Sequence, residues 1–63
     1  MRYEVMSADR ATGAHQKSIG RFDCPDQAEA EMRRRQEKQP RRCFYLFIHV
    51  TDKTRLMINH TAY

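Results

Sequence analysis

The segment from Cys43 to Val50 constrains the fold more than any other part of the chain. Its sequence is Cys-Phe-Tyr-Leu-Phe-Ile-His-Val. Aromatic and β-branched residues favour extended backbone, and a segment this apolar is typical of a strand with neighbours on both sides. We therefore expect a central β-strand here.

Alternate residues of a strand point to opposite faces of its sheet, which divides this segment into two sets. The wholly apolar set is Phe44, Leu46, Ile48 and Val50, and the set that mixes rings with polar groups is Tyr45, Phe47, His49 and Thr51. We expect the first set to face the hydrophobic core.

A helix is expected over residues 25–39. Asp23 or Cys24 stands at its N-terminal cap, and Pro25 fits the first turn, where its missing N–H costs nothing. Pro40 disfavours helical geometry at the residue before it, which ends the helix. The composition between these signals is rich in helix-forming residues.

The apolar surface of this helix is narrow. Met32 is its only large apolar residue, and Ala28 lies one turn earlier on the same side. Most of the core must therefore come from the sheet, and one helix can cover only one face of it.

Two further strands are expected before the helix. In Arg2–Ala8, Tyr and Val alternate with charged residues at the period of a half-buried strand. Small and turn-forming residues follow at 9–14, where Gly13 can adopt the positive φ that a hairpin loop often requires. The chain then returns as a second strand from His15 to Phe22.

The spacing of Ile19 and Phe22 predicts an irregularity in that second strand. A regular pleat sends residues three apart to opposite faces, so one of the two would point away from the core. A bulge at Gly20 would bring both side chains inward.

The last strand is expected at Leu56–His60, after a polar turn at 51–54. We predict a register with Val50 opposite Leu56, because Ile48 then meets Ile58 on the helix-covered face. The same register places on the other face Tyr45, Phe47, His49, Arg55, Met57 and Asn59.

These elements predict a single α+β domain over residues 1–63. Its element order is ββαββ, with an antiparallel four-stranded sheet made of two hairpins and one helix packed on one face. The order of the strands within the sheet is not set by these patterns.

Composition narrows the classes of protein to consider. The chain has 63 residues, of which 40% are hydrophobic and 32% charged, which is polar for a globular domain but not typical of disorder. There is no apolar run of the roughly 18 residues that span a membrane, and the N-terminus lacks a secretory signal, so we expect a cytoplasmic protein. Cys24 and Cys43 show no disulfide pattern and are interpreted as free thiols.

Basic residues cluster around the predicted end of the helix. The net charge is +4, which favours anionic partners. The candidate nucleic-acid contacts are Arg33, Arg34, Arg35, Lys38, Arg41 and Arg42, with Arg55 beside the aromatic residues. The alternative is structural, since acidic residues early in a helix and basic residues late in it complement the helix dipole.

The sheet face without a helix is the candidate protein interface. It carries Tyr45, Phe47, His49 and Met57. Exposed rings on a monomer mark an interaction site, and small domains often need oligomerisation, so we expect a homodimer or a protein partner. A platform for stacked nucleic-acid bases is the other interpretation.

Catalytic and metal chemistry find little support. The two cysteines and His15, His49 and His60 lack the close pairs typical of zinc sites, and no known catalytic motif is present. Cys24 lies where a helix dipole can activate a thiol, but no second cysteine is near it in sequence. We expect neither an enzyme nor a metal or other cofactor.

Two functional hypotheses follow. The first is a small non-enzymatic accessory or regulatory protein that engages a nucleic acid or nucleoprotein through its arginine-rich helix end. The second is a homodimeric protein-binding module or inhibitor, of the kind encoded by phages or plasmids, that docks another protein through its exposed sheet face or edge.

Overall fold

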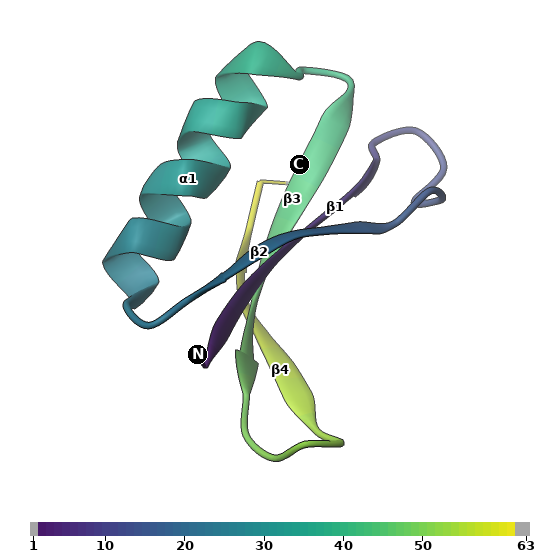
Figure 1. Cartoon of the computed structure of the whole chain (residues 1–63). Helices are drawn as coiled ribbons and strands as arrows, with labels where there is room; N and C mark the ends of the chain where they lie inside the picture. Colours follow the sequence, from purple (N-terminus) through teal and green to yellow (C-terminus); the bar gives the residue numbers. More distant parts are fainter. Residues whose placement is uncertain (1, 62–63) are drawn as a thin grey trace.

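The computed structural model describes residues 2–61 and contains four strands and one helix (Figure 1). In chain order these are β1 (Tyr3–Asp9), β2 (Lys17–Phe22), α1 (Pro25–Lys38), β3 (Arg42–His49) and β4 (Arg55–His60). The predicted α+β fold with ββαββ order is confirmed.

The four strands form one sheet in the order β2-β1-β3-β4, and every neighbouring pair is antiparallel. The two hairpins are therefore joined through β1 and β3, which occupy the centre. The prediction of a central third strand is confirmed. β2 and β4 are the two edges.

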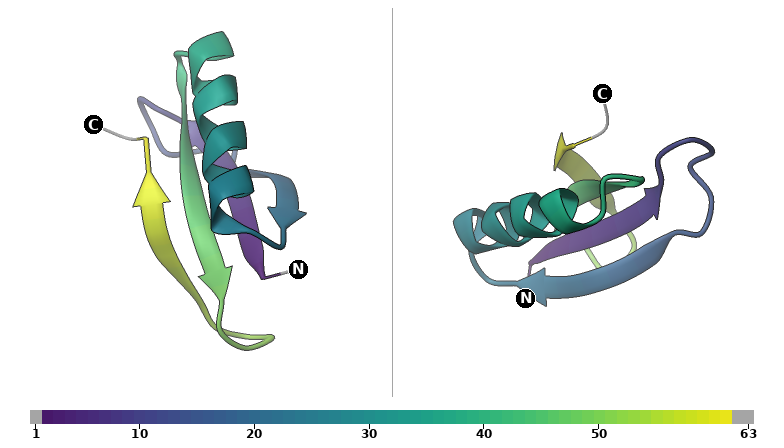
Figure 2. Two further views of the ribbon diagram at one scale, coloured as in Figure 1. Left: turned by 90° about the vertical axis from the view of Figure 1, so that its left-hand side faces the viewer. Right: turned by 90° about the horizontal axis from the view of Figure 1, so that it is seen from above.

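Helix α1 lies on one face of the sheet, over β1, β2 and β3 (Figure 2). We call this the helix face and the opposite one the open face. The core between helix and sheet is small, and its fully buried side chains are Val5, Ala28, Met32, Phe44 and Leu46. As predicted, Met32 and Ala28 are the buried residues of the helix.

The first hairpin contains a bulge, as predicted, but its extra residue is Ile19 and not Gly20. Val5 pairs with Gly20 and Met6 pairs with Ser18, so Ile19 has no partner of its own. The extra residue allows both Ile19 and Phe22 to pack against the core. In the loop before β2, Gly13 has a φ of 73°, as its position predicts, and His15 also has a positive φ, of 54°.

The predicted register of the second hairpin is wrong. Ile48 pairs with Leu56, not with Ile58, and Val50 belongs to the turn, where its N–H donates to the carbonyl oxygen of Thr54 at 2.9 Å. A second bulge then leaves Ile58 without a partner in β3.

Because of this bulge, the side chains at the end of β4 point to the opposite faces from those predicted. Asn59, predicted on the open face, pairs with Leu46 and donates from Nδ2 to Glu29 Oε1 of the helix at 3.0 Å. His60 takes the position opposite Tyr45 instead. Arg55 and Met57 precede the bulge, pair with His49 and Phe47, and lie on the open face as predicted.

Within residues 2–61 there is no helix that is both long and apolar enough to cross a membrane.

Candidate binding surfaces

The three helical arginines are partly neutralised by carboxylates of the same helix. Arg34 and Arg35 both donate to Glu31, Arg35 from Nε at 3.1 Å, and Arg33 lies 4.0 Å from Glu29. The hydrogen bond from Arg34 lowers the pKa of Glu31 despite partial burial, and Arg35 adds to the effect. The helix therefore presents less free positive charge than its arginine count indicates.

The remaining basic residues near the C-terminal end of the helix differ in their exposure and in their hydrogen-bond partners. Lys38 and Arg41 are exposed, and among the described residues neither forms an ion pair. Arg42 turns inward, and its Nη2 donates to Ser7 Oγ at 3.1 Å and to the His15 carbonyl at 2.7 Å. The backbone N–H of Arg10 donates to the Arg41 carbonyl at 3.0 Å, but its guanidinium Nη2 donates to the Thr61 carbonyl at 3.2 Å, just after β4.

A groove lies between the C-terminal half of α1 and β2. Its volume is about 290 Å³, and its lining contains three cations, one histidine and no carboxylate: Ser7, His15, Lys17, Ile19, Arg35, Gln39 and Arg42. The sequence pattern predicts Arg35 and Arg42 as contacts but gives no indication of Lys17 and His15. Lys17 and Ile19 are two residues apart, so in a regular strand they point to the same face. Because Ile19 is expected to face the core, this spacing was the signal that could have placed Lys17 beside the helix.

Arg55 lies far from this groove along the sheet. It belongs to a polar network on the open face centred on Glu4, which is 8% exposed. The Glu4 carboxylate accepts from Ser18 Oγ at 2.8 Å and from Arg55 Nη1 at 3.3 Å, and His49 Nε2 lies 2.8 Å from it. The sequence pattern indicates only that Glu4 is a charged residue of a half-buried strand, and it does not predict this network.

Burial opposes the ionisation of Glu4. The hydrogen bonds from His49 and Ser18, together with the charge of Arg21, outweigh that penalty, so the pKa of Glu4 lies below its ordinary value. The network therefore keeps the nearly buried Glu4 carboxylate in its ionised form.

The four predicted interface residues share the open face, but internal contacts occupy three of them. Phe47 lies under the Arg55 guanidinium, 4.5 Å from ring centroid to Cζ, and His49 contacts Glu4. A hydrogen bond of 3.1 Å joins Cys43 Sγ and Tyr45 Oη, and this bond, with burial, raises the pKa of Tyr45. Met57 remains about half exposed.

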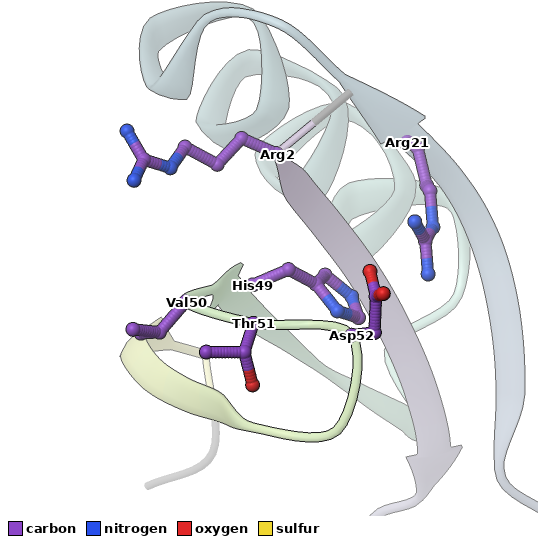
Figure 3. Close-up of a pocket in the computed structure, with 6 residues that line it drawn as sticks. All are labelled: Arg2, Arg21, His49, Val50, Thr51 and Asp52. Atoms are coloured by element: carbon purple, nitrogen blue, oxygen red, sulfur yellow. The ribbon is translucent and has the colours of Figure 1, made fainter.

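A second hollow surrounds His49 where β3 ends. Its volume is about 610 Å³, and Figure 3 shows its lining of Arg2, Arg21, His49, Val50, Thr51 and Asp52. Arg2 points away from the other five side chains, and the hollow combines both signs of charge.

The largest exposed apolar side chains lie along β4 and the turn before it. Leu56 is 56% exposed, Met57 and Ile58 are each 49% exposed, and Val50 is 50% exposed. The sequence pattern predicts Val50, Leu56 and Ile58 on the helix-covered face and therefore does not predict this exposed surface. We call residues 56–58 the β4 apolar edge.

Metal ligands do not gather in the described part of the chain. Among residues 2–61 there is no group of three or more His, Cys, Asp or Glu side chains that could hold a metal ion. Cys24 and Cys43 are both free thiols, and Cys24 is the N-cap residue of α1.

Comparison of the chain with protein-family models, with curated proteins and with solved structures found no match.

Proposed function

We propose that this chain is a non-enzymatic protein-binding module that receives an extended strand of its partner along β4. The observation that carries the proposal is the β4 apolar edge, in which three consecutive large apolar residues are each about half exposed on an edge strand. Proteins ordinarily protect such edges with charges, proline or a covering segment. Within residues 2–61, no strand lies outside β4.

The geometry supports this second hypothesis better than contact through the helix end. Arg33, Arg34 and Arg35 are already engaged by Glu29 and Glu31, so a ligand there must compete with existing ion pairs. Among residues 2–61, the β4 apolar edge has no comparable internal partner. Pairing with another strand would satisfy its outer backbone groups and cover its side chains.

Charge complementarity selects the chemistry of the partner. Lys53 and Arg55 precede the β4 apolar edge, and there is no carboxylate between Arg55 and His60. An extended segment that alternates apolar and acidic residues fits this surface. The backbone N–H of His60 already donates to Oδ1 of the adjacent Asn59 at 2.8 Å, so it is not available to a partner strand. We therefore assign the docking segment to residues 55–58.

A second copy of the chain fits the same edge less well. Self-pairing would bring two basic β4 strands together, with no acidic residue in either. It would also bring the Ile58 bulges of both copies into one short ladder of paired strands.

A labelled peptide of alternating valine and glutamate tests the proposal. Fluorescence anisotropy should show saturable binding, and the matched valine–lysine peptide should bind far more weakly. Burying the exposed half of a leucine or isoleucine contributes on the order of 1 kcal/mol, so the double variant Leu56→Thr/Ile58→Thr should weaken binding by roughly tenfold or more. Threonine keeps the strand propensity of both positions.

Val50→Thr is the matched control, because Val50 is equally exposed but lies in the turn. It should change affinity by less than about twofold, which is below 0.5 kcal/mol. Equal losses in the control and the double variant would contradict docking at β4. Sedimentation of the chain alone gives a second check: a dimer that Leu56→Thr/Ile58→Thr dissociates would make the occupant a second copy and overturn the acidic-strand assignment.

A further inference from the structure

We infer that the groove between α1 and β2 binds the phosphodiester backbone of a nucleic acid, with Lys17, Arg35 and Arg42 as the phosphate contacts. This site is separate from the proposed docking edge, because β2 and β4 are the two opposite edges of the sheet. It shares Arg35 and Arg42 with the contact surface that the sequence predicts at the helix end, and it adds Lys17 of β2.

Incompletely compensated positive charge is the first argument for the site. Three cations from β2, α1 and β3 line the groove, and the lining contains no carboxylate. Arg35 shares Glu31 with Arg34, whereas Lys17 and Arg42 form no ion pair with any residue of 2–61. Cations brought together without counter-charges repel one another, and a bound anion relieves that repulsion.

Arg42 is held in place for such a ligand. Its hydrogen bonds to Ser7 and His15 both come from Nη2, so within residues 2–61 Nε and Nη1 have no protein acceptor. A guanidinium presents five donors in a fixed plane, which suits the oxygens of a phosphate. Fixing the side chain in advance lowers the entropic cost of binding.

The loop before β2 supplies part of that fixation. His15 has a positive φ of 54°, a conformation that non-glycine residues rarely adopt, and its carbonyl accepts the 2.7 Å bond from Arg42. Asp9 braces the same loop through bonds from the Ala11 and Thr12 N–H groups to its Oδ1, at 2.9 and 3.3 Å. Strained backbone that is supported in this way often marks a functional site.

The surroundings of the groove favour a polymer over a single small anion. Lys38 and Arg41 adjoin the lining residues Gln39 and Arg42 in sequence, and both are exposed. These exposed cations extend the basic surface beyond the groove. The lining contains no Phe, Tyr or Trp on which a base could stack, so we assign contact to sugar and phosphate without reading of bases.

The test is a titration of the full chain against fluorescein-labelled mixed-sequence duplex DNA at 50 and 200 mM salt. Affinity should fall steeply with salt, because each neutralised phosphate releases about 0.9 counterion on duplex DNA. Lys17→Gln/Arg35→Gln should weaken binding at least tenfold at 50 mM and reduce the salt slope by close to two. Lys17→Glu should weaken binding in the same direction, and it provides a readout that does not depend on changing the helix.

Arg2→Gln/Lys53→Gln is the matched control, since it removes the same charge from exposed positions elsewhere on the molecule. It should weaken binding by less than threefold. An equal loss in both double variants would reduce the effect to net charge and overturn the site. A phosphoserine peptide that binds while DNA does not would also overturn it, in favour of a phosphoprotein ligand. Leu56→Thr/Ile58→Thr should leave DNA binding unchanged, so the failure of either proposal can be recognised separately.

Discussion

The Glu4 carboxylate shows how one residue can organise the open face. It is nearly buried, yet Ser18, His49 and Arg55 supply it with contacts from β2, β3 and β4. A buried carboxylate without such partners would be strongly destabilising. Glu4 therefore connects the three strands that surround β1 on that face, and its ionised form contributes to stability.

This contribution predicts an acid limit to folding. The pKa of Glu4 is lowered from 4.5 in the folded state, so both states are ionised well above pH 4.5 and the stabilisation is fully present there. As the pH falls below 4.5, the unfolded chain binds a proton that the folded chain does not, and stability declines until the pH passes the folded pKa. Urea unfolding followed by circular dichroism between pH 3 and 7 measures this loss.

The variant Glu4→Gln provides the comparison. It leaves the donors around position 4 less well satisfied, so at pH 7 we expect it to lower the free energy of unfolding by about 1–3 kcal/mol. Its stability should also depend less on pH below 4.5 than that of the parent chain. A parent and variant with parallel pH profiles would show that Glu4 contributes nothing to the acid limit.

Among the elements, the helix depends on a single large side chain. Met32 is 2% exposed and packs with Val5, Phe44 and Leu46, while the rest of α1 is polar apart from Ala28 and Ala30. Met32→Ala should lower the free energy of unfolding by about 2–5 kcal/mol, because it removes buried atoms and leaves a cavity. In a domain this small that is a large share of the total. Thermal unfolding measures it, and Met57→Ala, at an exposed position, should shift the midpoint far less.

The two bulges explain why one hairpin was predictable and the other was not. Ile19 and Phe22 are three residues apart, so a regular strand could not bury both, and the sequence itself indicated an irregularity. Leu56 and Ile58 are two apart, which is the spacing of a regular strand, and their sequence concealed the bulge at Ile58. The helix could be predicted because proline marks both of its ends.

The same distinction applies to the candidate sites. The open-face positions of Tyr45 and Phe47 follow from alternation within one strand, which the sequence contains. The groove joins Lys17 to Arg42, and the network joins Glu4 to Arg55, so both depend on strand order and register. Patterns within single segments do not determine strand order or register.

For the whole molecule, the sheet separates the two proposed surfaces. The groove adjoins β2 and the β4 apolar edge lies at the other edge, with β1 and β3 between them. Neighbouring strands are spaced by about 4.8 Å, so β2 and β4 are roughly 14 Å apart. This is larger than the screening length of about 8 Å at physiological ionic strength, but smaller than the 30 Å at 10 mM salt.

These lengths predict a salt-dependent coupling between the two ligands. A bound acidic peptide reduces the net charge of +4 and so weakens the attraction of the chain for DNA wherever that charge is felt across the sheet. At 10 mM salt, a saturating valine–glutamate peptide should therefore lower DNA affinity several-fold. At 150 mM the DNA affinity with and without peptide should agree within about twofold, because the interaction across the sheet is screened. The measurement is DNA anisotropy with and without peptide at both salt concentrations. A loss at 150 mM as large as that at 10 mM would mean that the two ligands compete for one surface, and the separation of the sites across the sheet would be wrong.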